Sequence, residues 1–295
     1  MKISVIIPFF NNHKTLPKTL ESLSKQSLKV FEIILIDDCS KNQKELEKIV
    51  DKYSRDLPLR LLKNTQNSNG AYSRNKGILA SKGDVVAFSD ADDIWLPNKT
   101  KLMIEFIKKV GLNFVFFSKA KILKNGVLTD SRPKSFNNNV HISEYLFLED
   151  GFIQTSTIFC SAEIAKQIMF NENFKRHQDY DFVLRASNMG FKFHFIPQDL
   201  VVYRADSEIN LNKGEGYMYS KVWLEEMKVF FSSKGYLGFK IFNLTARLLK
   251  EKRYIKAGLN FFEGFFKLKI SEYSRMIPKI KRIAKMTLSN NKTHD

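Results

Sequence analysis

The chain has 295 residues, of which 43% are hydrophobic, and it carries a net charge of +17 at neutral pH. This length and composition suit a folded protein with one large domain and an appendage, or with two domains. No run of eighteen apolar residues occurs and residues 1–4 lead into a strand-like run without a signal peptide, so we expect a cytoplasmic protein with no membrane-spanning helix. Cys39 and Cys160 are far apart with no His or Cys at ligand spacing, which argues against a disulfide framework and a zinc site.

The first third of the chain alternates strand-like and helix-like stretches. Apolar and β-branched runs predict strands at 2–8, 31–36, 59–62 and 85–88. Helical spacing of apolar residues predicts helices at 15–26, 42–53 and 70–81. This alternation predicts an α/β fold with a doubly wound sheet, which binds its ligands beyond the carboxyl ends of the strands.

An acidic stretch, SDADDIW at 89–95, directly follows the fourth predicted strand. Asp90, Asp92 and Asp93 place three carboxylates within four residues. Like charges this close raise one another's pKa, so the arrangement is costly unless a cation lies among them. The alternative is an ordinary turn, because Asp is common in turns after strands.

The loops after the four strands contain no glycine-rich phosphate-binding motif. This excludes a dinucleotide redox enzyme and a P-loop enzyme, and leaves bound phosphates to be neutralised by a metal and by Arg or Lys. Arg74 or Lys76 could supply that charge, or either could be a surface residue of its helix.

After Pro97 the alternation weakens, and the pattern predicts a mixed sheet. We expect helices at 99–109 and 142–148 and a helix starting close to Asp179. The expected strands and turns lie at 114–117, 124–127 (a hairpin turn), 154–160, 191–197 and 200–203.

From about Lys213 the sequence becomes helical and basic. Residues 213–295 contain 18 Lys and Arg against 7 Asp and Glu, together with pairs of Phe. Helices are expected at 217–231, 239–250, 254–269 and 271–286, the last with a break or kink at Pro278. The composition predicts a surface that faces anionic lipid headgroups or a polyanion, with a solvated helical face as the alternative.

Five stretches, taken in order, resemble the family 2 inverting glycosyltransferases of the GT-A fold. They are VIIPFFNN, EIILIDDCS, NGAYSRNKGILASKGDVVAFSDADDIWLP, HQDYDFVLR and LVVYR, and the likeness covers about residues 1–210. The resemblance implies a GT-A domain at 1–212, divided into a nucleotide-sugar-binding half (1–97) and an acceptor half (98–212). The basic helical region, 213–295, would follow as a C-terminal extension.

The resemblance also implies roles for individual residues in donor binding. It assigns to the base, the ribose and the diphosphate the residues Pro8, Phe9, Asn11, Asp37 or Asp38, Asn69 and Arg74. It places Asp92 on the metal and Asp90 near the metal or the ribose, with Asp93 as an extra carboxylate. Magnesium or manganese suits such an all-oxygen site.

Inversion at the anomeric carbon requires a base that takes the proton of the acceptor hydroxyl. The resemblance assigns this role to Asp179, with Asp181 as the runner-up. The family commonly has Glu before this Asp, whereas this chain has Gln178, which we expect to hydrogen-bond the acceptor or the donor sugar.

Four further side chains have both a functional and a structural interpretation. His177 is expected near the acceptor and His194 in a structural position. Trp95 is either a platform for sugar stacking or a core residue. Arg204 resembles the position from which the family closes a loop over the diphosphate, although the histidine often found downstream is absent.

Together these features predict a metal-dependent inverting glycosyltransferase that uses a UDP-sugar, with Mn²⁺ or Mg²⁺, to transfer a hexosyl or N-acetylhexosaminyl group. The acceptor would be a glycan or a lipid-linked precursor in lipopolysaccharide, O-antigen or capsule synthesis, and the basic helices would hold the enzyme at the inner face of the membrane. No nucleic acid partner is expected. A sugar nucleotidyltransferase and a non-catalytic glycan- or polyanion-binding protein are the alternatives; the first should have a glycine-rich loop after the first strand, and the second leaves the acidic cluster unexplained.

Overall fold

The computed structural model describes residues 1–205 and 216–291, with the side chains of the last helix described to residue 283. The chain divides into two compact units. The first consists of Met1–Lys134 and Ile153–Lys213, and the second of Ser135–Phe152 and Gly214–Asp295. Residues 135–152, which we expected within the acceptor half, therefore pack with the C-terminal helices.

The first unit is built on a mixed sheet whose parallel half has the order β3-β2-β1-β4. These strands are β1 (Ile3–Phe9), β2 (Glu32–Asp37), β3 (Leu59–Lys63) and β4 (Val85–Phe88). All residues of β2 and β4 are buried, as expected for strands covered on both faces. Their carboxyl ends consequently meet at one edge of the sheet.

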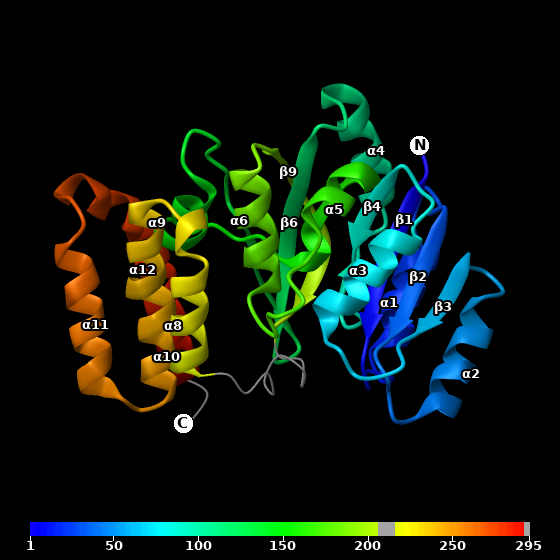
Figure 1. Ribbon diagram of the computed structural model, residues 1–295, viewed down its shortest axis with the longest axis horizontal. Coiled ribbons are helices and arrows are strands. Elements are labelled where there is room, and N and C mark those ends of the chain that lie inside the picture. The colour runs from blue at the N-terminus through cyan, green and yellow to red at the C-terminus, as the bar shows by residue number, and fades with distance from the viewer. Residues whose placement is uncertain (206–215, 292–295) are drawn as a thin grey trace. The chain divides into compact units, whose positions relative to one another are not determined.

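Helices cover this sheet at the places that the sequence pattern indicates. The first four are α1 (Leu16–Ser24), α2 (Gln43–Tyr53), α3 (Gly70–Ala80) and α4 (Lys99–Val110). Two more follow, α5 (Ala162–Ile168) and α6 (Gln178–Asn188). Neighbouring helices α3, α5 and α6 lie in a row over one face of the sheet (Figure 1).

The second half of the sheet is mixed, as predicted, but its strands differ in extent. It contains β5 (Ile94–Trp95), β6 (Phe114–Lys124), β7 (Val127–Arg132), β8 (Ile158–Ser161) and β9 (Lys192–Arg204). The strand expected at 154–160 begins only at Ile158, because Gln154 caps a short 3₁₀ turn, Thr155–Thr157.

The two strands expected at 191–197 and 200–203 are one strand, β9. Its parallel register with β6 shifts after Ile196, which pairs with Ser118, so that Lys119 pairs with Asp199. The shift accommodates Pro197, which has no N–H to donate to the ladder. The proline therefore makes an irregularity in β9 and does not end it.

The second unit is helical. Its helices are α8 (Tyr217–Glu226), α9 (Ser233–Gly238), α10 (Thr245–Lys250), α11 (Tyr254–Phe266) and α12 (Ile270–Asn291), with a π-helical segment, η4 (Phe239–Leu244), between α9 and α10. Of the break or kink predicted at Pro278, the break is wrong, because α12 continues through the proline. Met276 is fully buried in the core of the unit, and Lys279 donates to the carbonyls of Leu146 and Phe147, so packing on both sides of the proline holds the helix.

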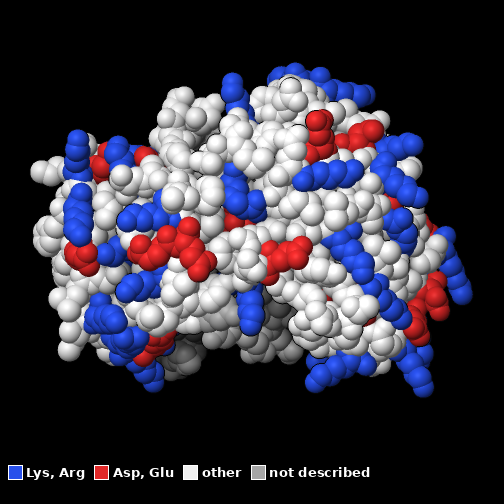
Figure 2. Space-filling view, in the orientation of Figure 1, with Lys and Arg blue, Asp and Glu red and all other residues white. Residues whose placement is uncertain are grey.

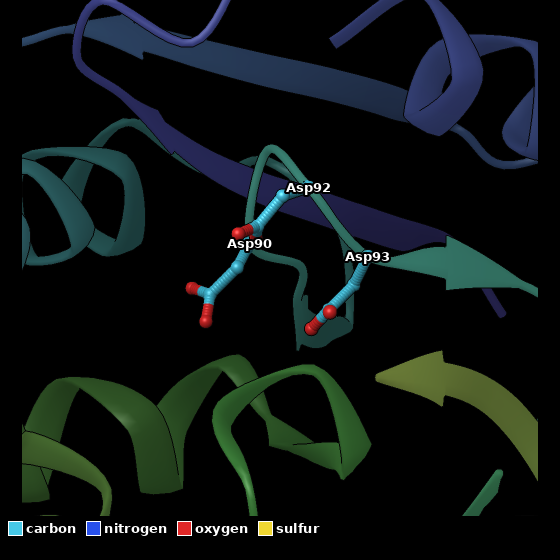
Figure 3. Close-up of side chains that lie close together, drawn as sticks. All are labelled: Asp90, Asp92 and Asp93. Carbon is cyan, nitrogen blue, oxygen red and sulfur yellow. The ribbon is translucent and has the colours of Figure 1, made fainter. Parts of the chain in front are cut away.

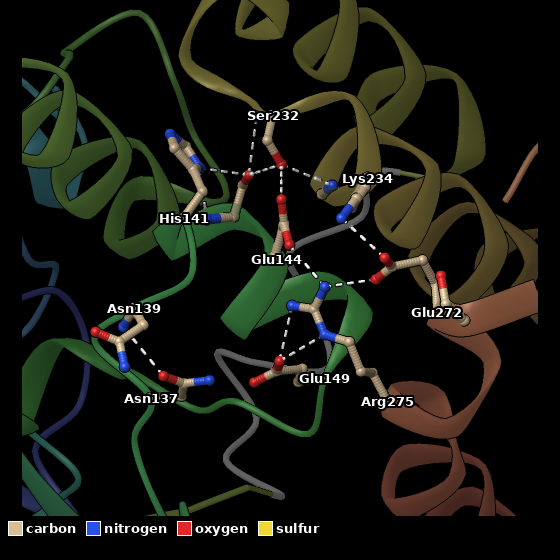
Figure 4. Close-up of polar contacts among 12 residues, drawn as sticks. Asn137, Asn139, His141, Glu144, Glu149, Ser232, Lys234, Glu272 and Arg275 are labelled. Atoms are coloured by element: carbon tan, nitrogen blue, oxygen red, sulfur yellow. Dashed lines mark hydrogen bonds and ion pairs between the residues drawn. The ribbon is translucent and has the colours of Figure 1, made fainter. Parts of the chain in front are cut away.

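Segment 135–152 joins this unit through a π-helical turn, η1 (Glu144–Leu148). Two glycines of α9 permit the close approach, since a Cβ on Gly235 would lie 2.1 Å from Ser143 Oγ and one on Gly238 would lie 2.7 Å from Leu148 N. Arg275 of α12 contacts carboxylates of the same segment (Figure 4). Helix-to-segment contacts thus make η1 part of the core of the second unit.

The basic excess of the chain is dispersed on the face that Figure 2 shows. Lys and Arg side chains occur there in small groups, with carboxylates between them. None of the helices in the described part of the chain combines the length and the apolar character that crossing a bilayer requires.

Candidate active site

A pocket lies at the carboxyl ends of the parallel strands, where the loops after β1, β2, β3 and β4 meet. Seven of the residues expected at a donor site line it: Pro8, Phe9, Asp38, Asn69, Arg74, Asp90 and Asp92. Gln178, expected to contact the acceptor or the donor sugar, lines it as well. The lining also includes residues to which we had given no role, among them Phe10, Asn67, Ser73 and Lys175. Phe10 is an exposed aromatic ring and Lys175 is a cation, so both are suited to contact a nucleotide.

The acidic stretch forms a turn after β4 that gathers three carboxylates (Figure 3). Oxygen atoms of Asp90, Asp92 and Asp93 lie within 4.8 Å of one another. Asp93 is fully buried, Asp92 is 8% exposed and Asp90 is half-buried at the pocket. Such a set of oxygen donors suits Mg²⁺ or Mn²⁺ and does not suit zinc.

Asp93 faces the protein interior and holds the turn together. Its carboxylate accepts hydrogen bonds from Ser156 Oγ at 2.6 Å, Gln154 Nε2 at 3.1 Å and the backbone N–H of Arg204 at 3.0 Å. Burial raises its pKa well above the ordinary range, and the neighbouring charges of Asp92 and Asp90 raise it further. The bonds to both of its oxygens make Asp93 an anchor of the turn, and leave Asp92 and Asp90 as the carboxylates that line the pocket.

Arg74 joins two of the expected donor residues. Its guanidinium donates to Asp90 Oδ1 at 2.5 Å and to Gln178 Oε1 at 2.8 Å. The alternative that Arg74 is a surface residue is wrong, because it is 6% exposed. Lys76, by contrast, donates to the carbonyl of Lys63 and does not line the pocket.

Asp38 organises the loop that follows β3. Its carboxylate accepts from the backbone N–H groups of Ser68 and Asn69, both at 2.9 Å, and from the side chains of Asn64 and Asn67. Asn69 in turn caps α3 by accepting from Ala71 N. Asp38 therefore shapes the pocket wall in addition to lining it.

Two expected donor residues do not line the pocket. Asp37 is 1% exposed, and its carboxylate accepts from Ser40 N and Gln43 Nε2. Asn11 accepts from the backbone N–H of Lys41 and adopts a left-handed backbone conformation with a φ of 52°. Both residues stabilise the loops behind the pocket, so of the pair Asp37 and Asp38 the structure favours Asp38.

Asp179 lies in the first turn of α6, half-buried, and its Oδ1 accepts from the N–H of Tyr180. A carboxylate in this position is stabilised as an anion by the helix dipole. Tyr203 of β9 connects it electrostatically to the acidic turn: burial raises the pKa of the Tyr203 hydroxyl, and the charges of Asp93, Asp179, Asp90 and Asp92 raise it further. Sequence reasoning missed Tyr203, although it is part of the LVVYR motif.

Asp181, the runner-up base, is fully buried and accepts two hydrogen bonds from Arg185, at 2.8 and 2.6 Å. It also accepts from the backbone N–H of Asn171. A buried carboxylate held in this way is out of reach of an acceptor, so Asp181 is structural.

Trp95, which we expected to be either a platform for sugar stacking or a core residue, is a core residue. It is 1% exposed and Lys99 Nζ lies 3.9 Å from the centre of its ring, so neither face is open to a sugar. His177 is 8% exposed, precedes α6 in a left-handed conformation and stacks on Tyr180. His194 packs among aromatic rings, those of Phe106, Phe114 and Phe116.

Arg204 lies against the acidic turn, where its Nε donates to the carbonyl of Asp92 at 3.3 Å. The resemblance expects a loop to close over the diphosphate near Arg204, and residues 206–215 follow directly in the chain. That expectation lies outside the described residues.

A second layer of polar side chains supports the acidic turn, and sequence reasoning assigned it no role. Ser156 Oγ donates to Asp93 and accepts from the N–H of Asp90 at 2.8 Å, and Gln154 Nε2 donates to both Asp90 and Asp93. Behind them, buried Lys99 donates to the carbonyl of Ser156 at 2.5 Å, and its burial lowers its pKa well below the usual range. The sequence feature that could have indicated this layer is the polar run Gln154 to Thr157, which precedes a buried strand.

The fold and this site define a GT-A glycosyltransferase: a parallel β3-β2-β1-β4 half whose strand ends form a pocket, and an acidic turn after the fourth strand. The chain belongs to glycosyl transferase family 2, whose model matches residues 4–169. It is 35% identical over 274 residues to the amylovoran biosynthesis glycosyltransferase AmsB of Erwinia amylovora, covering 90% of this chain and 91% of that protein. It is 28% identical to the putative teichuronic acid biosynthesis glycosyltransferase TuaG of Bacillus subtilis, covering 72% and 82%.

Solved structures agree on the fold. The crystal structure of S. aureus TarS 1-349 in complex with UDP-GlcNAc superposes with a TM-score of 0.65 at 21% identity, covering 94% of this chain and 79% of that one. The recognised family and GT-A fold class are thus confirmed, and the nucleotidyltransferase and non-catalytic alternatives are wrong.

Proposed function

We propose that this glycosyltransferase transfers a sugar, with inversion, from a UDP-sugar to a hydroxyl of a glycan or lipid-linked acceptor in the synthesis of a bacterial surface polysaccharide. The observation that carries the proposal is the acidic turn, whose Asp90 and Asp92 line the same pocket as Asp38, Asn69 and Arg74. The names of AmsB and TuaG, and the UDP-GlcNAc bound by TarS, support the substrate classes.

In the donor pocket, Pro8, Phe9 and the exposed ring of Phe10 form an apolar wall for the base, and Asp38 and Asn69 offer polar groups to the base or ribose. Arg74 and Lys175 also line the pocket and would bring positive charge to a bound diphosphate. This arrangement replaces the glycine-rich cradle that the chain lacks.

Asp92, with Asp90 beside it, would hold a Mg²⁺ or Mn²⁺ ion, which stabilises the negative charge that a departing diphosphate gains. Asp93 keeps the turn in shape through its bonds to Ser156 and Gln154. Arg74 lies 2.5 Å from Asp90 and already neutralises part of the charge of that carboxylate.

Asp179 acts as the general base. The acceptor oxygen forms a bond to the anomeric carbon as the bond from that carbon to the diphosphate oxygen breaks. The electron pair of the broken bond leaves with UDP, and the hydroxyl proton passes to a carboxylate oxygen of Asp179. Attack opposite the leaving group inverts the anomeric centre.

We further propose that the basic C-terminal helices associate with the inner face of the cell membrane, where lipid-linked acceptors would be presented. Their excess of Lys and Arg, 18 against 7 acidic residues in 213–295, supports this.

The test of the donor and metal is a thermal-shift screen of UDP-, GDP- and dTDP-sugars with and without Mn²⁺, followed by hydrolysis of the best donor. We expect stabilisation by a UDP-sugar only with the metal, and its loss in Asp92→Ala. Full turnover by Asp92→Ala would overturn the metal assignment, and preference for another nucleotide would overturn UDP.

A further inference from the structure

Helix α11 of the second unit is apolar on two opposite sides. Ala257, Asn260 and Gly264 are buried, and the neighbouring Phe261 and Phe265 pack against the core cluster that contains Ile241 and Met276. The other side carries Ile255, Leu259, Phe262 and Phe266, which are 54 to 84% exposed. We call these four residues the outer stripe.

The outer stripe is one continuous face. Its residues are separated by four, three and four positions, which is the spacing of neighbours along one side of an α-helix. Ile270, at the start of α12, is 83% exposed and extends the apolar surface. A surface helix normally has polar residues opposite its core-facing side, and a contiguous exposed apolar patch marks an interaction surface.

Positive charge borders the outer stripe at both ends. Lys250, Lys252, Arg253 and Lys256 are exposed at the start of α11, where Arg253 forms an ion pair with the exposed Glu251 at 3.2 Å, and Lys267 and Lys269 are exposed at its end. The only acidic residue within α11, Glu263, forms ion pairs with Lys240 and Lys267, both at 2.9 Å. No described carboxylate of the helix is therefore left to oppose an anionic partner.

Taken together, these observations match the chemistry of a bilayer interface. Helix α11 has 13 residues, so it is about 20 Å long, too short to span a bilayer but suited to lie in its surface. A second copy of the chain is disfavoured, because cations border both ends of the stripe and would face cations in either parallel or antiparallel pairing. Aromatic and aliphatic side chains flanked by lysines fit the headgroup region of an anionic membrane.

We propose that the outer stripe of α11 is the surface by which this protein inserts into the headgroup region of an anionic bilayer. The proposal deepens the membrane association stated above and rests on it. It assigns insertion to Ile255, Leu259, Phe262 and Phe266, and electrostatic attraction to the lysines at the ends of the helix.

Co-sedimentation of the full chain with phosphatidylglycerol vesicles, compared with phosphatidylcholine vesicles, tests this. We expect binding to the anionic vesicles, reduced at least tenfold in Leu259→Glu/Phe262→Glu and weakened by high salt. The matched control is Leu79→Glu/Leu128→Glu, which introduces the same two negative charges at residues of the first unit that are 66% and 53% exposed, and it should bind as the parent protein does. Equal binding by the double variant would overturn the proposal, as would a switch from dimer to monomer without any change in vesicle binding.

A second measurement does not depend on the stability of the double variant. Trp95 and Trp223 are both 1% exposed, so a tryptophan placed in the stripe by Phe262→Trp supplies the environment-sensitive emission. We expect that emission to shift to shorter wavelength on addition of phosphatidylglycerol vesicles, whereas Leu79→Trp should not shift. An unchanged spectrum would contradict insertion. UDP-sugar hydrolysis without vesicles, assayed in the same variants, reports separately on the glycosyltransfer proposal.

Discussion

Each unit contains a cluster of carboxylates, and the two clusters differ in the groups that compensate their negative charge. In the second unit, Arg275 forms ion pairs with Glu144, Glu149 and Glu272 at 2.5 to 2.8 Å, and Lys234 pairs with Glu272 (Figure 4). In the first unit, buried Asp93 is held by Ser156, Gln154 and a backbone N–H, none of which carries a charge.

The pKa values move in opposite directions. Hydrogen bonds from Lys234 and Arg275 lower the pKa of Glu272, whereas burial and the neighbouring carboxylates raise that of Asp93. The cations of the second unit stabilise the fold. In the acidic turn Arg74 pairs with Asp90, but the hydrogen bonds of buried Asp93 come from uncharged groups, so its negative charge is costly until a cation binds nearby. The same residue type is thus structural in one unit and suited to function in the other.

The largest effect expected is on catalysis at the first unit. Asp179→Asn removes the proton acceptor and should lower transfer by about 10²- to 10⁴-fold, because a neutral amide cannot take the proton of the acceptor hydroxyl. Binding of UDP, measured by calorimetry, should be unchanged. Asp51→Asn, an exposed change on α2, is the matched control. A loss of UDP affinity as large as the loss of rate would assign Asp179 to donor binding instead.

The next largest effect is expected on the stability of the second unit. Arg275→Met leaves three carboxylates close together without their shared cation and should lower the free energy of unfolding by about 2 kcal/mol, a figure reduced because Arg275 is partly exposed. Fluorescence of Trp223 during urea unfolding, in a Trp95→Phe background, reports on this unit alone.

Lys267→Met provides the control for that measurement, since it breaks an ion pair with Glu263 in the same unit whose side chains are 59% and 52% exposed. It should change stability by less than about 0.5 kcal/mol. Equal effects of the two substitutions would mean that the Arg275 cluster is no more than an ordinary set of surface ion pairs.

A smaller effect is expected from the layer behind the acidic turn. Ser156→Ala removes the hydroxyl that donates to Asp93 and accepts from Asp90 N, so the turn loses part of its support. Substitution of a residue that orients metal ligands typically lowers metal affinity by about 10- to 100-fold. We expect a change at the lower end of this range for Mn²⁺-dependent UDP binding. Ser118→Ala, a buried serine whose hydroxyl bonds to the Lys119 carbonyl, should leave that affinity intact. Identical dissociation constants for all three proteins would remove Ser156 from the site.

The parallel half of the first unit could be predicted because its signals are local. Each strand is a short apolar run, such as the fully buried Val85–Phe88, and each is followed by polar residues at the sheet edge. That rule was sufficient to bring Asp38, Arg74 and Asp92 to one pocket. It failed for Asp37, because adjacent residues of an extended chain point to opposite sides, and of the two only Asp38 lines the pocket.

The missed features depend on contacts between distant residues. Gln154 and Ser156 reach the acidic turn because β8 pairs antiparallel with β4, a neighbour relation that no local pattern encodes. Residues 135–152 pack with the helical unit because of the close approach at Gly235 and Gly238, two glycines with no distinctive sequence context. Trp95 is sequestered by Lys99, a residue that composition alone would place at the surface.

The smallest expected effect is a change of stability with pH. The direction of the pKa shift differs between the two clusters, because the pKa of Glu272 is lowered and that of Asp93 is raised. The folded pKa of Glu272 lies below its ordinary value of 4.5, so its ion pairs stabilise the second unit above pH 4.5, and that stability is lost as the pH falls through the folded pKa. Between pH 5 and pH 3 the free energy of unfolding reported by Trp223 should therefore decrease, by under about 1 kcal/mol for this residue. In Glu272→Gln the decrease should be smaller, because the side chain no longer titrates. An unchanged pH dependence in that variant would show that other carboxylates, such as Glu263 with its pKa of about 2, carry the effect.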